Sequence, residues 1–328
     1  LIDFWASWCN PCRKEIPIYR VNDRAGSISV KVAPEKVVGV VRTNERDQIA
    51  AFTPLNETTS RIGQNVADFL LGEYQRGAIP REFLPLQSGV GNIANAILGA
   101  LGADSKLPAF SMYTEVIQNS VIDLMMQERI RFVAGSSLTL SDDRLDMLYS
   151  HIDELRERIL LRPQEITNHP EMIRRLGIIA VNTALEADIF GNVNSTHVLG
   201  SKMMNGIGGS ADFARNAYLS IFTTPSTAKN GLVSSIVPHV SHVDSTEHDV
   251  RILVTEQGVA DLRGKSPSQR ARCIIENCAH PDYKELLWDY LKLSEGKSCH
   301  TPMSLRNAFK MHIAFAETGD MHNTKFEL

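Results

Sequence analysis

The sequence predicts an α/β fold in which an open, mostly parallel sheet is flanked by helices. From Val37 onward, apolar runs of strand length alternate with amphipathic segments of helical period. The same stretch contains no internal repeat and no low-complexity tract. Strands that are separated by helices are typical of open, largely parallel sheets.

The composition agrees with a globular fold and excludes several partners. Of the 328 residues, 43% are hydrophobic and 22% are charged, which is enough apolar material for a sizeable core. The formal net charge of -4 gives no basic field for nucleic acid or an anionic membrane. No apolar run reaches the roughly 18 to 20 residues of a membrane span. Five cysteines, an odd number, do not form a disulfide framework. We therefore expect reduced thiols and a cytoplasmic protein without nucleic-acid or membrane partners.

The first 22 residues differ in kind from the rest. They resemble the strand, redox turn and helix start of thioredoxin-like proteins, with Cys9 as the attacking thiol and Cys12 as the resolving one. A thioredoxin-like domain needs several strands and helices, and nothing after about residue 22 continues the pattern. We therefore interpret residues 1–22 as a non-functional fusion or junction fragment without thiol-disulfide exchange. Residues 23–36 are polar, contain Gly and Pro, and are predicted to be a linker.

Residues 58–74 form the first predicted helix. Thr58 or Thr59 can cap it, an apolar stripe follows one face, and Gly77 comes after its end. In open parallel sheets, ligands bind outside the carboxyl ends of the strands, so functional residues are expected on strand-to-helix turns. The predicted strands cover residues 109–113, 131–134, 178–181, 218–222 and 251–255, and two further helices cover residues 266–278 and 282–294.

Two strand-to-helix turns carry candidate site residues. In residues 84–95, two glycines precede a helix predicted over residues 92–101, whose start offers unpaired amides to an anionic group. Glu115 follows the strand 109–113 and, by its pattern, begins a helix. A helix amino terminus favours an ionised carboxylate, so Glu115 is a candidate nucleophile. The alternative is a glutamate that only complements the helix dipole.

A third turn, residues 205–215, places three glycines before Ser210 and Asp212, which could cap a following helix. Such a loop exposes backbone amides that could bind an oxyanion or a phosphate. It lacks the Lys and Ser/Thr that end a P-loop, and its glycine spacing does not match the dinucleotide motif. Kinase and dehydrogenase functions are therefore disfavoured.

Histidines gather at His239, His242 and His248, beside Asp244. The segment is predicted to be extended, and residues three apart on a strand point to opposite faces. No paired cysteine ligands accompany them. We therefore expect polar loop histidines and no metal site.

Five longer motifs follow one another along the chain. They are Gln87-Ser-Gly-Val-Gly-Asn-Ile-Ala-Asn, Tyr113-Thr-Glu-Val-Ile-Gln-Asn-Ser, Leu161-Arg-Pro-Gln-Glu-Ile-Thr-Asn-His-Pro, Met204-Asn-Gly-Ile-Gly-Gly-Ser-Ala-Asp-Phe and Val254-Thr-Glu-Gln-Gly-Val-Ala-Asp-Leu-Arg-Gly. In this order they resemble the acetyl-CoA hydrolase/transferase family, in its succinate:acetate (or propionate) CoA-transferase branch. The resemblance runs from about Val37 to the carboxyl terminus. It implies that residues 37–328 form a CoA-transferase-like carboxyl-terminal domain.

The resemblance implies that Glu115 is the nucleophile. Glu115 would attack an acyl-CoA thioester to give an acyl-glutamyl anhydride, and CoA thiolate would return to give a glutamyl-CoA thioester. An acceptor carboxylate would resolve the thioester, so that coenzyme A, as a substrate, moves between a short acyl-CoA and acetate, propionate or succinate. Gly209 would donate a backbone N–H to the tetrahedral oxyanions, Asn168 a side-chain amide, and the Val90-Gly91 turn another backbone N–H.

The resemblance also implies the residues that contact CoA. They are Val90, Gly91, Asn92, Ile93, Ala94, Asn205, Gly209 and Lys229. Lys229 suits an anionic or carbonyl-rich part of CoA. A structural role for Asn168 stays open, because Asn168-His-Pro also resembles a helix cap with Pro170 in the first turn.

One departure from the family bears on activity. Family members carry an additional amino-terminal α/β domain, with the acyl-CoA cleft between the two halves, and we expect this chain to lack it. Two alternatives to a transferase follow. One is an acyl-CoA hydrolase, in which water resolves the intermediate, and the other is an inactive fragment that binds CoA weakly. The resemblance also implies a homodimer.

Overall fold

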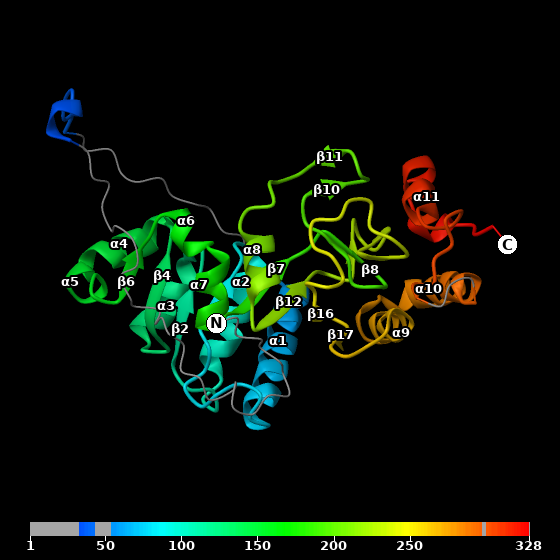
Figure 1. The fold of residues 1–328 in the computed structure, drawn as a ribbon, viewed down its shortest axis with the longest axis horizontal. Helices are drawn as coiled ribbons and strands as arrows, with labels where there is room; N and C mark the ends of the chain where they lie inside the picture. The colour runs from blue at the N-terminus through cyan, green and yellow to red at the C-terminus, as the bar shows by residue number, and fades with distance from the viewer. Residues whose placement is uncertain (1–32, 43–53, 297–299, 328) are drawn as a thin grey trace.

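An eight-stranded sheet forms the centre of the computed structural model, which describes residues 33–42, 54–296 and 300–327 (Figure 1). The strands are ordered β17-β16-β12-β7-β1-β2-β4-β6, and all pair in parallel except the edge strand β17. The predicted open, mostly parallel sheet is confirmed. Its strands are β1 (Leu86–Ser88), β2 (Phe110–Tyr113), β4 (Ile130–Gly135), β6 (Ile159–Leu161), β7 (Ile179–Thr183), β12 (Leu219–Thr223), β16 (Ile252–Thr255) and β17 (Gly258–Asp261).

The chain builds this sheet outward from β1 in both directions. After β1 it adds β2, β4 and β6 on one side, then returns to place β7, β12 and β16 on the other. At such a reversal, the connections from the two central strands diverge to opposite faces of the sheet and leave a crevice at the carboxyl ends. The switch point of this sheet therefore lies between β1 and β7.

Helices cover both faces of the sheet. Ile179 and Val181 of β7 pack into a core with α1, α2 and α3, whereas Ala180 packs into a second core with α7 and α8. This division follows from the strand period, which sends alternate side chains to opposite faces. The helices are α1 (Glu57–Gln75), α2 (Asn92–Ala103), α3 (Asn119–Met126), α4 (Asp142–Ser150), α5 (Ile152–Leu155), α6 (Gln164–Thr167), α7 (Pro170–Leu176), α8 (Ser210–Asn216), α9 (Pro267–Cys278), α10 (Pro281–Ser294) and α11 (Lys310–Thr318), with 3-10 turns at Pro34–Lys36 and Met321–Asn323.

The helix α1 shows how local sequence sets an element. Its apolar stripe is buried, as predicted, with Ile62 and Val66 fully covered. The cap is Asn56, two or three residues before the predicted threonines. The Asn56 side chain accepts from the Thr59 amide at 2.8 Å, and the Thr59 hydroxyl accepts from the Asn56 amide at 3.1 Å. Thr59 is therefore the reciprocal partner in a capping box.

Short strands follow the carboxyl ends of β2, β4, β7 and β12. The strands after β2 and β4 pair with each other, and those after β7 and β12 form small sheets that extend the molecule toward the end occupied by α9, α10 and α11 (Figure 1). A third core, with Phe190, Tyr283 and Tyr290, joins these strands to the carboxyl-terminal helices. The short strands are β3 (Val116–Gln118), β5 (Ser137–Thr139), β8 (Glu186–Asp188), β9 (Val193–Asn194), β10 (His197–Val198), β11 (Lys202–Met203), β13 (Thr227–Ala228), β14 (Val233–Ser234) and β15 (Ile236–Val237).

The predicted thioredoxin-like fragment, residues 1–22, lies outside the described residues, and so does most of the predicted linker. Residues 33–42 are exposed, and among the described residues the first helix that packs into the core is α1. The predicted division at residue 37 therefore stays a prediction.

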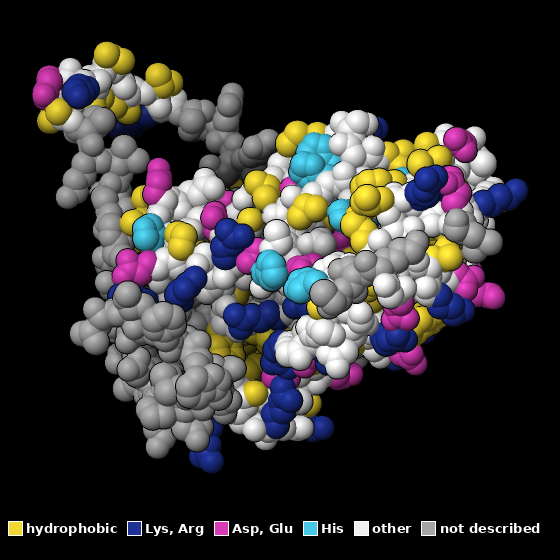
Figure 2. Space-filling model, turned by 45° about the vertical axis from the view of Figure 1, so that its right-hand side comes forward, with side chains coloured by type: hydrophobic (Ala, Val, Ile, Leu, Met, Phe, Trp, Pro, Cys, Tyr) yellow, Lys and Arg dark blue, Asp and Glu magenta, His cyan; other side chains and the backbone are white. Residues whose placement is uncertain are grey.

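Acidic and basic side chains are interspersed on the face shown in Figure 2, as expected for a small net charge. Among the described residues, no helix is both long enough and apolar enough to cross a membrane.

Candidate active site

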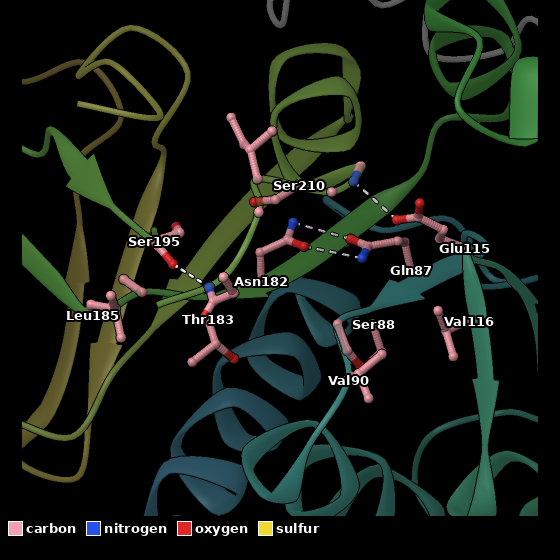
Figure 3. Close-up of a pocket in the computed structure, with 17 residues that line it drawn as sticks. Gln87, Ser88, Val90, Glu115, Val116, Asn182, Thr183, Leu185, Ser195 and Ser210 are labelled. Carbon is pink, nitrogen blue, oxygen red and sulfur yellow. Dashed lines mark hydrogen bonds between the residues drawn. The ribbon is translucent and has the colours of Figure 1, made fainter. Parts of the chain in front are cut away.

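A cavity of about 430 Å³ opens at the switch point of the sheet. The carboxyl ends of β1 and β7 line it, together with the turn after β1, the bend after β2 and the glycine-rich loop before α8 (Figure 3). Its lining comprises Gln87, Ser88, Gly89, Val90, Glu115, Val116, Asn182, Thr183, Ala184, Leu185, Ser195, Asn205, Gly206, Ile207, Gly208, Gly209 and Ser210. Glu115 is the one charged side chain among these residues.

Glu115 occupies a bend between β2 and β3, and α3 begins only at Asn119. The prediction that Glu115 starts a helix is therefore wrong. Residues 116–118 instead form β3, which pairs in parallel with β5. The amides of Ser136 and Ser137, which precede or begin β5, donate to the Glu115 carbonyl at 2.8 and 3.1 Å. This pairing captures backbone groups that a helix would have used, so no helix of its own segment begins at Glu115.

Three neutral groups donate hydrogen bonds to the half-buried Glu115 carboxylate. The Gly209 backbone N–H donates to Oε2 at 3.0 Å (Figure 3). The side-chain amides of Asn168 and Gln164 donate to Oε1 at 3.4 and 3.3 Å. The cavity lining contains no Lys, Arg or His. The carboxylate is therefore oriented by amides without being neutralised by a cation in the cavity.

A side chain at Gly209 would displace the two groups that contact Glu115 in this structure. A Cβ at Gly209 would lie 2.4 Å from Asn168 Nδ2 and 2.6 Å from Glu115 Oε2. Both distances are far below van der Waals contact. The missing side chain lets the backbone amide approach the carboxylate directly.

Asn168 reaches Glu115 from the end of α6. Its backbone amide closes that helix by donating to the Gln164 carbonyl at 2.8 Å. The N-cap of α7 is His169, with Pro170 in the first turn, so the cap predicted around Asn168 begins one residue later. The Asn168 side-chain oxygen is buried and has no hydrogen-bond partner among the described residues. This carboxamide is therefore held for contact with Glu115 and not for capping.

Tyr113 fixes α6 beside the bend. Its hydroxyl donates to the Ile166 carbonyl at 2.9 Å, and the Arg162 guanidinium lies 5.7 Å from the centre of its ring. Burial raises the pKa of Tyr113 to about 12, so the phenol keeps its proton and its donor role near neutral pH.

The turn after β1 is held by Gln118 of β3. The Gln118 side chain donates to the Gly89 carbonyl at 2.9 Å and accepts from the Gly91 amide at 3.2 Å. Gly91 has a φ of 116°, which favours glycine. The Gly91 amide is used in its hydrogen bond to Gln118. The Val90 amide of the same turn has no hydrogen-bond partner among the described residues. The backbone donor predicted for the Val90-Gly91 turn stays a prediction.

The predicted CoA-contact residues divide into two groups. Val90, Asn205 and Gly209 line the cavity, and Val90 is 50% exposed. The other predicted contacts lie outside its lining: Gly91, Asn92, Ile93 and Ala94 in the turn and the first turn of α2, and Lys229 in the β13–β14 connection. The Lys229 ammonium lies 4.6 Å from the centre of the Phe315 ring. These contacts with CoA stay predictions.

The fold also brings polar residues to the site that the sequence motifs did not single out, among them Gln87, Gln164, Asn182 and Ser195. Gln164 stands four residues before Asn168, a spacing that places both side chains on one helix face. That spacing was a usable signal. Gln87 and Asn182 are polar residues at the carboxyl ends of apolar strands, which is a weaker one. No local pattern marks Ser195.

The clustered histidines are engaged in separate contacts. The His242 imidazole lies 3.3 Å from the Asp244 carboxylate and packs on His197 with 4.0 Å between ring centroids. His239 instead packs edge-on against Phe309. Within the part of the chain that the structure describes, no group of three or more His, Cys, Asp or Glu side chains is placed to hold a metal ion.

The fold is an α/β fold that resembles solved structures, one of them of a CoA-transferase. RipA from Yersinia pestis is similar in structure, with a TM-score of 0.63 and 28% identity over 75% of this chain and 55% of that one. A 4-hydroxybutyrate CoA-transferase from Porphyromonas gingivalis is also similar, with a TM-score of 0.58 and 27% identity over 74% of this chain and 57% of its own.

Sequence comparisons identify the family. Residues 145–291 match the acetyl-CoA hydrolase/transferase C-terminal domain. The succinyl-CoA:acetate CoA-transferase of Clostridium kluyveri is 51% identical over 314 residues, which cover 95% of this chain and 58% of that protein. The propanoyl-CoA:succinate CoA transferase of Escherichia coli is 51% identical, with 95% and 63% covered. An acetyl-CoA hydrolase of Schizosaccharomyces pombe is 49% identical, with 95% and 61% covered. The chain belongs to the acetyl-CoA hydrolase/transferase family.

The chain spans about three fifths of the length of these relatives. The matched stretch is longer than residues 37–328, so the similarity begins before Val37.

Proposed function

We propose that this protein is a CoA-transferase that moves CoA between a short acyl-CoA and a small carboxylate such as acetate, propionate or succinate. One observation carries the proposal. Glu115 faces a cavity at the switch point and is oriented by three neutral amide donors, with no cation in the cavity lining. Two transferases among the relatives support the same reaction type.

The first step is attack of a Glu115 carboxylate oxygen on the thioester carbonyl carbon. The new C–O bond forms as the carbonyl electron pair moves to oxygen, and collapse of this oxyanion expels CoA thiolate. The product is a mixed anhydride between Glu115 and the acyl group. The thiolate then attacks the Glu115 carbonyl carbon and releases the original acyl group as a free carboxylate, which leaves a glutamyl-CoA thioester.

The second half repeats these steps in reverse with the acceptor. The acceptor carboxylate attacks the glutamyl thioester and releases CoA thiolate, which then attacks the acceptor carbonyl and frees Glu115. Each bond that breaks is replaced by one of similar energy, so the thioester energy is kept.

The neutral donors suit both roles that Glu115 must play. A lysine or arginine in contact would hold the carboxylate as an ion pair and make it a weaker nucleophile. Amides orient the carboxylate. They can also donate to the oxyanion that forms on the acyl carbonyl or on the Glu115 carbonyl. Gly209 and Asn168 are proposed to donate to the oxyanion on Glu115. The Val90 amide, across the cavity, is proposed to donate to the oxyanion on the substrate.

Hydrolysis is the second candidate, and the acetyl-CoA hydrolase among the relatives favours it. Water would then resolve the glutamyl intermediate in place of the acceptor. The same Glu115 geometry serves both outcomes, so the acceptor decides between them.

Trapping of the intermediate tests the proposal. After incubation with acetyl-CoA, borohydride should reduce a Glu115 thioester to an alcohol, and peptide mass spectrometry should find this change at residue 115. Glu115→Gln keeps the shape of the side chain and should show no adduct. An adduct on another residue, or labelling that persists in Glu115→Gln, would refute the nucleophile assignment.

The length of the chain sets the design of this experiment. It should be done on the chain alone and on the chain joined to the part of the Clostridium relative that it does not cover. Labelling in the joined protein alone would support a fragment that needs a further part. Formation of succinyl-CoA from acetyl-CoA and added succinate would indicate transfer, whereas release of free CoA without an acceptor would indicate hydrolysis. A homodimer remains a prediction.

A further inference from the structure

The deep end of the cavity is polar, and one of its groups has no hydrogen-bond partner. Ser195 lines the cavity in the turn between β9 and β10 and is only 9% exposed. Its hydroxyl oxygen is fully covered and makes no hydrogen bond within the described residues. An unsatisfied buried hydroxyl costs free energy, so a ligand atom that bonds to it gains this interaction on binding.

The backbone of Ser195 is held from both sides. Its carbonyl accepts from Asn205 Nδ2 at 2.7 Å (Figure 3). Its amide donates to Asp244 Oδ2 at 2.7 Å. Asp244 also accepts from the hydroxyl of Thr196 at 2.8 Å. The orientation of Ser195 is therefore fixed by neighbours that do not engage its hydroxyl.

A pair of buried amides lies between Ser195 and Glu115 in the view of Figure 3. Gln87 Nε2 donates to Asn182 Oδ1 at 3.1 Å, and Asn182 Nδ2 donates to Gln87 Oε1 at 3.2 Å. An amide nitrogen carries two hydrogens, and each partner uses one of them in this pair. Both side chains line the cavity, and each amide nitrogen has a second hydrogen that this pair does not use.

The rim of the cavity differs from this deep end. Val90 and Ile207 at the rim are 50% and 43% exposed, whereas Gln87, Asn182 and Ser195 are buried. The bulk of CoA has to stay outside a cavity of about 430 Å³, so the acyl group is the part that enters. A plain hydrocarbon chain would cover these polar groups without bonding to them.

We infer that Ser195 and the Gln87–Asn182 pair form a subsite for the terminal oxygen of an acyl group that ends in a carboxylate or a hydroxyl. This inference rests on the proposed function, and it assigns substrate selection to residues that take no part in bond making. The donors are neutral, so they bind a hydroxyl or a carboxylate through hydrogen bonds without a counter-ion.

Three methyl ketones test the subsite without turnover. Levulinate, 5-hydroxypentan-2-one and pentan-2-one stand for succinyl, 4-hydroxybutyryl and butyryl thioesters, with a methyl group in place of the CoA sulfur. They differ only at the terminal group. Titration of each into the full chain is followed by NMR of the Gln87 and Asn182 side-chain amides. Saturable binding is expected for the two oxygen-bearing ketones, and binding about tenfold weaker for pentan-2-one.

Substitution then separates recognition from structure. Ser195→Ala should weaken levulinate about tenfold and leave pentan-2-one unchanged. Gln87→Glu should exclude levulinate by like charge and keep 5-hydroxypentan-2-one. Ser294→Ala is the matched control, because Ser294 is a buried serine of α10 whose hydroxyl donates to the Tyr290 carbonyl at 2.8 Å. It should change none of the three affinities.

The inference is overturned if no ketone binds saturably, if the three bind the unaltered chain equally, or if Ser195→Ala weakens all of them alike. Its failure is distinguishable from failure of the proposed function. Acetyl-CoA can label Glu115 without such a subsite, and levulinate can bind to a chain that does not react.

Discussion

The Glu115 bend and the strand β8 each hold a glutamate, and they hold it in opposite ways. Glu115 is half-buried, borders a cavity and accepts from three neutral amides. Glu186 of β8 is buried and pairs with His312 Nε2 at 2.8 Å through Oε2. Its Oε1 accepts from the Asn194 side chain and from the amide and hydroxyl of Ser241, at 2.7 to 2.9 Å.

This difference separates a carboxylate suited to chemistry from one suited to structure. The Glu186 oxygens are fully used, and its ion pair ties α11 to β8. Burial opposes the charge of Glu186, but the hydrogen bond and charge of His312 outweigh it and lower the pKa of Glu186 below its ordinary value. Glu115 keeps a side toward the cavity where a substrate can approach. Both are glutamates, so only their burial and their partners distinguish them.

The largest effect is expected from removing the buried acceptor. Glu186→Ala leaves the His312 imidazole and the donors around it without a partner, which should lower the free energy of unfolding by about 3 to 5 kcal/mol. Urea unfolding followed by circular dichroism measures it. Glu157→Ala is the control, because Glu157 is 74% exposed and its change should be within about 0.5 kcal/mol. Glu115→Gln should also change stability by less than about 1 kcal/mol, and equal losses at residues 115 and 186 would contradict the comparison.

A smaller effect, confined to activity, is expected at Gly209. Gly209→Ala would push a methyl group against Asn168 and Glu115, so the backbone donor and the carboxylate would separate. Loss of one oxyanion donor should slow formation of the Glu115 adduct about 10²- to 10³-fold. Rapid-quench labelling with acetyl-CoA measures this rate. Gly206→Ala is the matched control, because a Cβ there meets nothing within 4 Å. Equal rates in both variants would contradict the role of Gly209.

The smallest effect is a pH dependence that originates two residues from Glu186. Burial raises the pKa of Asp188 to about 6, although Asn192 and backbone amides donate to it. The folded chain therefore keeps a proton that the unfolded chain has lost, and stability should fall as pH rises from about 4 to about 6. Asp188→Asn should remove this slope, as seen in thermal unfolding at several pH values.

Glu186 should act in the opposite direction. Because its pKa is lowered, its stabilisation is present above its ordinary pKa and is lost as pH falls below it.

A variant Asp188→Asn that keeps the full slope between about pH 4 and pH 6 would show that burial does not control Asp188.

Much of the fold could be predicted because its signals are local. The five predicted strands became β2, β4, β7, β12 and β16, shifted by one or two residues at most of their ends, because each is an apolar run that is buried on both faces. The helix α1 followed from a stripe at helical period. Its cap was misplaced because two threonines and Asn56 all suit that position.

The site was only partly predictable. Glycine-rich turns and a glutamate after a strand are visible locally, and the structure brings Glu115, Asn168 and Gly209 together. The helix expected at Glu115 was wrong because the segment pairs with β5, some twenty residues away. Gln164 and Ser195 were missed because their roles depend on neighbours that local pattern does not show.

By itself, the sequence determined the alternating α/β order, the parallel sheet and the family, since apolar periodicity and contiguous motifs are properties of short segments. Only the tertiary structure decided which polar residues meet. The Gly209 amide and the Glu115 carboxylate are 94 positions apart and 3.0 Å from each other. Their contact depends on the switch point between β1 and β7. This switch point arises because the chain, after β6, returns to pair β7 with the other edge of β1.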